Sequence, residues 1–459
     1  MSSRTAPPWP LVALFTAGYL AAYLLPTTVG RLDSGLPLSA TEAGSIGSAL
    51  LLSSAFAGFL LAAHVHRIGP RRLARAGLLL AAVGYGTAAL SHSIPVVVAG
   101  AVAGGFGSGT ATTVAATGIA AQRDPHRAST LGLLSVSALA GAVYLTVPHL
   151  GPGHGLPLAA IALTALLVWP ATGRLTAFAP TTTAPLGTGE TGRLPHLRSG
   201  LVLAAGILCW SLAQNSLWGV SGRIGLTQAH LTEVTVGAVF AIALGAGLLG
   251  VIGAGVLGPR LGRALPIGAG TALIAGCIAL SASATGLGTF AAGEIAWNTL
   301  YPIVLSYLIG LAASLDQRGR WAVLVGSASS LGTAAGPLIG SVLSARAGFP
   351  AMGAILAAGL LAITLPLTAV ALHTGGRPLL PGAVRRRWGY PLLEELAGGT
   401  PAAVVAASTG TPSGPVPPVG APEQPVVEIR LDGPARTAQQ TYDTAGPRQA
   451  TATPGPGTH

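Results

Sequence analysis

The chain alternates twelve long apolar runs with shorter polar segments. The runs lie at residues 10–30, 42–63, 73–91, 94–121, 129–150, 154–172, 200–221, 231–254, 264–284, 286–313, 321–345 and 350–372. A helix needs about 20 apolar residues to cross the hydrocarbon core of a bilayer, and each run has about that length. The pattern therefore predicts an all-α polytopic membrane protein with twelve transmembrane helices.

The polar segment at 173–199 is longer than the others and contains three prolines and three arginines. Six apolar runs precede it and six follow it. We therefore expect two pseudo-symmetric six-helix halves, residues 1–172 and 200–373, joined by a cytoplasmic linker at 173–199. Residues 374–459 are dominated by Pro, Gly, Thr and Ala. Such a segment cannot bury enough apolar surface to offset its ordering entropy, which predicts a disordered cytoplasmic tail.

Composition supports the membrane class. Hydrophobic residues make up 51% of the 459 residues and charged residues only 8%, a balance that a soluble domain could not bury. The net charge of +11 is carried by arginine alone, since the chain has no lysine. These arginines lie between apolar runs, so membrane orientation explains them better than nucleic-acid binding does, and we expect no nucleic-acid partner.

The arginines also predict the orientation. With the N-terminus placed in the cytoplasm, 21 arginines lie on the cytoplasmic side and three, Arg31, Arg223 and Arg346, lie outside. Loops rich in arginine are retained on the cytoplasmic side, so both termini are expected there, in a multi-pass protein of the cell membrane. Asp33, Glu42, Arg223 and Glu233 lie near outer helix ends, where we expect them to be solvated.

A loop between the second and third runs carries the densest charge. Residues 64–75 hold two histidines and four arginines around Gly69-Pro70, a pair suited to a tight turn. A shorter copy, Gly255–Arg263, follows at the equivalent place in the second half. The repetition indicates a duplicated chain.

These two loops resemble the signature between helices two and three of the major facilitator superfamily, roughly Gly-x-Leu-Ala-Asp-Arg-x-Gly-Arg-Arg. The matching positions are Arg67, Gly69 and Arg71 in the first copy, and Gly255, Leu257, Arg260, Gly262 and Arg263 in the second. The acidic position is occupied by His66 and by Pro259 instead. The resemblance extends over about residues 10–372. It implies a secondary transporter that alternates between inward- and outward-open states, with gating loops formed by Arg67, Gly69, Arg71, Arg72, Arg260, Gly262 and Arg263.

Glu294 is the most unusual polar residue of the apolar runs. It lies about 12 Å inside the tenth run at a helical rise of 1.5 Å per residue. A carboxyl group at that depth is costly to ionise and is a functional candidate by default. It suits a group that takes up and releases protons. The alternative is a structural glutamate that is hydrogen-bonded to a neighbouring helix.

The candidate substrate-binding residues are aromatic or carry an amide. They are Tyr19, Tyr23, Trp210, Gln214, Asn215, Trp218, Asn298 and Tyr301. Within each run they recur at three or four residues, so they share a helix face, and indoles with amides between them suit an organic molecule. Packing against a neighbouring helix is the alternative. The resemblance implies that helices one, four, seven and ten line a central cavity, which favours substrate contact.

Together these features predict a secondary active transporter for a fairly apolar organic molecule. No arginine lies deep in a run, so we expect a neutral or cationic substrate, with proton-coupled export of a drug or secondary metabolite. The alternatives are uptake of a neutral nutrient, and a transporter-like sensor or scaffold that signals through its tail. The sequence shows no nucleophile, phosphate-loop or zinc-site motif, so we expect no enzyme activity, cofactor or metal. The expected partners are the substrate, the bilayer and the proton, and the expected state is a monomer.

Overall fold

The computed structural model describes residues 8–122, 124–175, 194–257, 262–316 and 319–375. Within these ranges every regular element is a helix and no strand occurs, which confirms the predicted all-α class. The expected linker lies mostly outside the described residues, and the tail beyond residue 375 lies outside them entirely.

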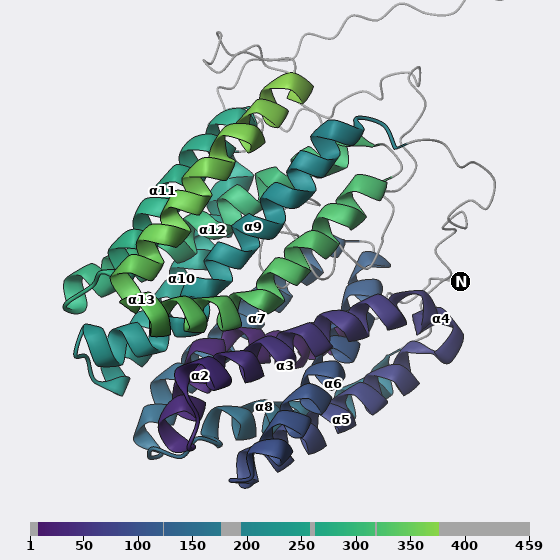
Figure 1. The fold of residues 1–459 in the computed structure, drawn as a ribbon. Coiled ribbons are helices and arrows are strands. Elements are labelled where there is room, and N and C mark those ends of the chain that lie inside the picture. Colours follow the sequence, from purple (N-terminus) through teal and green to yellow (C-terminus); the bar gives the residue numbers. More distant parts are fainter. Residues whose placement is uncertain (1–7, 123, 176–193, 258–261, 317–318, 376–459) are drawn as a thin grey trace, which may run out of the picture. The chain divides into compact units, whose positions relative to one another are not determined.

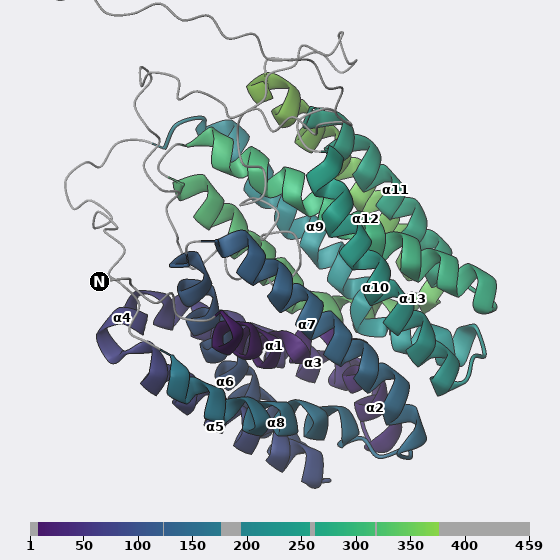
Figure 2. The ribbon, with the colours of Figure 1, turned by 180° about the vertical axis from the view of Figure 1, so that it is seen from behind.

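Figures 1 and 2 show a first group of helices in purple and blue and a second in teal and green. The first group comprises α1 (Trp9–Tyr23), α2 (Leu25–Gly35), α3 (Ala40–Leu61), α4 (Val65–Ile68), α5 (Pro70–Leu90), α6 (Ile94–Ala120), α7 (Pro125–Thr146) and α8 (Leu156–Val168). The second comprises α9 (Leu197–Arg223), α10 (Glu233–Leu257), α11 (Ala264–Ala282), α12 (Leu287–Leu315) and α13 (Arg320–Gly375). Short 3-10 turns at Ala62–His64, Val147–His149 and Trp169–Arg174, and a π turn at Ile224–Gln228, extend four of them.

Ten of the described helices are long and apolar enough to cross a membrane, and the bent pair α1 and α2 makes an eleventh crossing. The two last predicted runs both lie in α13, on either side of Gly348, where the backbone leaves helical geometry at φ 79°. Counted as two crossings, α13 makes the described helices consistent with the twelve predicted runs.

The first predicted crossing, over residues 10–30, is formed by two helices with a bend between them. The chain bends by 48° between α1 and α2, at Leu24. Pro26 lies in the first turn of α2, and proline has no N–H to donate to the carbonyl four residues earlier. The carbonyl of Ala22 is therefore left without its helical partner at the bend.

The connections between helices gather at two ends of the bundle. At the end that carries Arg31, the His154 ring bonds the carbonyl of Ser91 at 3.0 Å, and Gln228 Nε2 donates to the carbonyl of Ala284 at 3.0 Å. At the other end, which carries Arg67, Trp321 Nε1 donates to the carbonyl of Pro195 at 2.7 Å. We call these the Arg31 end and the Arg67 end.

The two groups touch through small residues between the Arg31 end and the middle of the bundle. Gly44 of α3 lies so close to Ser341 of α13 that a Cβ would not fit. One turn further along α3, Ser48 Oγ accepts a hydrogen bond from the backbone N–H of Leu338 at 2.9 Å. Close approach of small residues is how apolar helices associate when no water drives them together.

Candidate functional site

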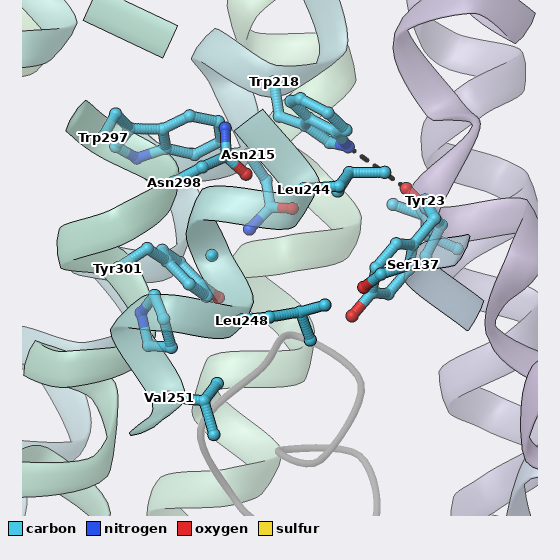
Figure 3. A pocket seen from close by; sticks show the side chains of 14 residues that line it. Tyr23, Ser137, Asn215, Trp218, Leu244, Leu248, Val251, Trp297, Asn298 and Tyr301 are labelled. Carbon is cyan, nitrogen blue, oxygen red and sulfur yellow. Dashed lines mark hydrogen bonds between the residues drawn. The ribbon is translucent and has the colours of Figure 1, made fainter. Parts of the chain in front are cut away.

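A cavity with about 720 Å³ of empty space, which includes open solvent, lies between the two groups of helices (Figure 3). Its lining residues are Ala22, Tyr23, Leu51, Ser137, Asn215, Trp218, Leu244, Gly247, Leu248, Val251, Trp297, Asn298, Tyr301 and Pro302. The wall is mainly apolar and aromatic with a few amides and hydroxyls, a composition typical of a site for an organic molecule.

The structure brings five of the eight predicted substrate residues to this wall. They are Tyr23 of α1, Asn215 and Trp218 of α9, and Asn298 and Tyr301 of α12. Figure 3 shows α9 and α12 presenting their side chains from one side of the cavity, with Tyr23 on the opposite side.

The other three lie behind the wall. Trp210 is fully buried and stacks on the ring of Tyr301, with centroids 5.0 Å apart. Gln214 is also fully buried, and its side-chain oxygen accepts a hydrogen bond from Trp297 Nε1. Tyr19 packs on the ring of Phe15 at 4.4 Å. Trp210 and Gln214 thus support lining side chains from behind, and none of the three residues lines the cavity itself.

Trp297 and the inner face of α10 line the cavity without having been predicted. Trp297 lies three residues after Glu294, so the helical spacing that singled out Asn298 and Tyr301 also contained it. Leu244, Leu248 and Val251 of α10 carry no such signal, because α10 is apolar on all sides.

The bend between α1 and α2 closes the cavity toward the Arg31 end. Trp218 Nε1 donates to the carbonyl of Ala22 at 3.1 Å, across the boundary between the groups. This carbonyl is the one that Pro26 leaves unpaired. The neighbouring carbonyl of Tyr23 accepts a hydrogen bond from the hydroxyl of Tyr144 at 2.5 Å. The carbonyl of Ala22, which the bend leaves free, thus becomes an attachment point between the two groups of helices.

Glu294 lies in the same closing region, one turn of α12 from Asn298. It is fully buried, and its Oε1 accepts hydrogen bonds from the hydroxyls of Ser221 at 2.8 Å and Ser281 at 2.6 Å. Its other oxygen has no hydrogen-bond partner among the described residues. The carboxyl group therefore ties α12 to α9 and α11, and keeps one acceptor unused.

Two arginines hold the groups together at the Arg31 end. Arg31 of α2, only 3% exposed, pairs with Glu233 of α10 at 2.7 Å. Arg223 of α9, 8% exposed, pairs with Asp33 of α2 at 3.8 Å. We call these four residues the arginine seal. The expectation that Arg223 is solvated is wrong, because the opposite group supplies it, like Arg31, with the acidic partner that burial requires.

The two halves of the seal are built alike. The arginines occupy matching sequences, Gly30-Arg31-Leu32 and Gly222-Arg223-Ile224. Each is also held within its own group. Arg31 donates to the carbonyl of Gly151 at 2.7 Å, just beyond α7 and its 3-10 extension, and Arg223 donates to the hydroxyl of Ser341 at 2.9 Å on α13. This equivalence is what a duplicated chain produces.

The loops rich in arginine lie at the Arg67 end. Gly69 and Gly262 have φ of 93° and 67°, so both copies turn at a glycine in a conformation that disfavours other residues. The side chains of Arg67, Arg71 and Arg72 are exposed and that of Arg263 is half-buried, while Arg260 lies outside the described residues. Their gating role stays a prediction.

The fold is that of a multi-pass membrane protein in which paired groups of apolar helices surround a cavity that is closed toward the Arg31 end. The sequence profile of the Major Facilitator Superfamily matches residues 11–315, and the chain belongs to this family. The crystal structure of the human organic anion transporter MFSD10 (TETRAN) is similar, with a TM-score of 0.56 and 18% sequence identity. The similarity covers 79% of this chain and 99% of that one, and at this identity it shows the shared fold. No curated protein matches the sequence significantly.

Proposed function

We propose that the protein is a proton-coupled exporter of a fairly apolar, neutral or cationic organic molecule, such as a drug or secondary metabolite. The observation that carries this proposal is a cavity with aromatic and amide walls beside a fully buried glutamate on the same helix, α12. Substrate and proton would then act on one rigid element. This is the coupling that exchange transport needs, since a ligand shifts a conformational equilibrium only through its different affinity for the two states.

The proposed direction of export is from the cytoplasm. The arginine distribution places the Arg67 end in the cytoplasm and the Arg31 end outside. In this orientation the arginine seal and the bond from Trp218 to Ala22 lie on the outer side, which supports an inward-facing state. Reporter fusions at Gly153 and Gly376 test this orientation, and a cytoplasmic signal from Gly153 would reverse it.

Glu294 is the proposed proton carrier. In the low-dielectric wall no basic residue among the described ones forms an ion pair with it, so its neutral form is the less costly one there. Outward opening would separate the two groups at the outer end and bring outside water to this part of the second group, where the carboxyl would exchange its proton.

The relative named as an organic anion transporter suggests a second substrate class. No arginine or histidine lines the described cavity of this chain. An anion would therefore lose its hydration without gaining a counter-charge, and we do not propose anion transport here.

The test is transport in inverted vesicles with and without an imposed pH gradient, with a cationic dye and a neutral dye as probes. The unmodified protein should accumulate at least one of them only when the gradient is present. Glu294→Gln keeps the shape and the hydrogen bonds from Ser221 and Ser281 but cannot ionise. It should bind the dye and lose uphill accumulation, whereas Glu294→Asp should retain part of it.

Uphill transport by the glutamine variant would remove Glu294 from the mechanism. Accumulation without a gradient would refute proton coupling. A protein that moves no probe, but whose cellular effect vanishes when residues 376–459 are deleted, would favour the scaffold alternative.

A further inference from the structure

Two asparagine side chains on the cavity wall already donate hydrogen bonds to neighbouring protein atoms. Asn215 Nδ2 donates to the carbonyl of Ser211 at 2.9 Å and to the hydroxyl of Thr333 at 3.2 Å. Asn298 Nδ2 donates to the carbonyl of Glu294 at 3.0 Å. Both amides are therefore anchored through nitrogen, which leaves their oxygens as acceptors for an occupant of the cavity.

The same wall holds one buried donor that has no partner. The hydroxyl of Tyr301 is buried without a hydrogen bond among the described residues, although its ring is fixed by stacking on Trp210. Buried hydroxyls usually find a partner, so an unpaired one at a cavity wall indicates a bond that forms only when the cavity is filled. In Figure 3 this hydroxyl and the two amides lie on the same side of the cavity.

Charge is missing from the lining. The fourteen residues that line the cavity include no Asp, Glu, Arg or His. The nearby Glu294 is fully buried behind the wall, with one oxygen held by two serines. A bound ion would lose its water without meeting an opposite charge, and the attraction of aromatic faces for a cation compensates this only in part.

The aromatic rings determine the shape of the cavity. Trp218 and Trp297 lie 5.6 Å apart, and Trp297 and Tyr301 lie 6.1 Å apart. Their faces and edges, with Leu244 and Leu248 across from them, favour an occupant with a flat ring system.

We propose that the cavity binds an uncharged, flat molecule that carries both an N–H or O–H donor, for Asn215 or Asn298, and an oxygen acceptor, for Tyr301. This inference rests on the proposed transport function and narrows its substrate class from neutral or cationic to neutral molecules with both groups. A lactam fused to aromatic rings meets these requirements.

The test uses four probes that share one ring system: acridone, N-methylacridone, N-methylacridinium and acridine-9-carboxylate. Binding to the full-length protein in lipid nanodiscs is measured by equilibrium dialysis, with empty nanodiscs as the reference. Acridone should bind most tightly. N-methylacridone lacks the N–H and should bind about three- to tenfold more weakly, the range expected for one neutral hydrogen bond. Both ions should bind more weakly still.

The variant Tyr301→Phe removes the unpaired hydroxyl without breaking any hydrogen bond of the described protein, so it should fold normally. It should weaken acridone binding about three- to tenfold. Tyr85→Phe, which removes a buried hydroxyl that accepts a hydrogen bond from Ser108 and does not line the cavity, is the control and should leave binding unchanged.

Three outcomes would overturn the inference: equal binding of acridone and N-methylacridone, tighter binding of the acridinium ion, or binding of none of the four. The result is separable from the transport proposal. If the probes bind in the expected order but the protein moves no acridone across a vesicle membrane, only the transport proposal is refuted. If the protein transports the acridinium ion in preference to acridone, only the proposed substrate class is refuted.

Discussion

At the scale of single residues, one missing N–H decides how the cavity is closed. Pro26 bends the first crossing and leaves the carbonyl of Ala22 free, and Trp218 donates to that carbonyl from the other group of helices. The strength of the closure thus depends on a residue that itself makes no polar contact across the boundary.

Pro26→Ala should weaken this closure. The restored N–H would bond the carbonyl of Ala22 within its own helix and displace Trp218. Losing one such bond shifts the balance between states by about three- to tenfold. The measurement is labelling of a cysteine placed at Leu244, in a background without Cys209 and Cys277, by a membrane-impermeant maleimide added from the outer side.

Trp218→Phe should raise labelling similarly, since it keeps an aromatic ring but loses the donor. The double variant should be no faster than Pro26→Ala alone, because both changes remove the same bond. Pro157→Ala is the control, as Pro157 occupies the first turn of α8, where a missing N–H costs nothing. An unchanged labelling rate for Pro26→Ala would show that the bend is not part of the closure.

At the scale of elements, the loop between α4 and α5 combines a strained corner with exposed charge. Gly69 has φ 93° and ψ 133°, with open space where a Cβ would lie. Substitution there would be opposed by backbone strain and not by a clash. Arg67 and Arg71 are exposed beside it, so neither contributes much to the stability of the described state.

These features predict that one variant loses stability and that another loses transport rate. Gly69→Ala should lower the stability of the folded protein by about 1–3 kcal/mol through strain alone. Replacing Arg67 and Arg71 together by alanine should slow transport while leaving thermal unfolding and the inserted amount nearly unchanged, because we expect these side chains to find partners only when the cytoplasmic side closes. Thermal unfolding in detergent and initial transport rates measure the two effects.

The matched control is Arg346→Ala, an exposed arginine at the opposite end. Should the double arginine variant lose inserted protein and transport in equal proportion, the loop would serve only to orient the chain in the membrane.

At the scale of the whole molecule, the arginine seal joins positions far apart in the sequence. Each arginine is held by its own group and paired with an acid of the other, so the pairs must break whenever the groups separate at the outer end. The two pairs are unequal. Arg31 and Glu233 are 2.7 Å apart, whereas Arg223 and Asp33 are 3.8 Å apart.

Glu233→Gln should therefore increase outside labelling at Leu244 more than Asp33→Asn does. The side chain of Glu233 is 39% exposed, so solvent screens the pair and the expected effect is modest, on the order of 1 kcal/mol. Salt at 1 M, where the screening length is about 3 Å, should increase labelling of the unmodified protein and have less effect on Glu233→Gln. A larger effect of Asp33→Asn would make Arg223 the main closing residue.

The sequence by itself determined the all-α membrane class, and it indicated the duplication. A bilayer admits only long apolar helices with their backbone bonds satisfied internally, so twelve runs of about 20 residues left little choice of fold class. Local chemistry likewise predicted the turns at Gly69 and Gly262 and the shared face of Asn298 and Tyr301 on α12.

Only the tertiary structure decided which face of each helix meets the cavity. Trp210 and Trp218 lie on the same helix with the same spacing signal, yet Trp210 packs behind Tyr301 and Trp218 lines the wall. Helices that are apolar on all sides carry no amphipathic pattern, so the helices that pack against them determine which face lines the cavity. The tertiary structure also decided that Arg31 pairs with Glu233. The two residues are 202 positions apart, so nothing in the sequence indicates the ion pair.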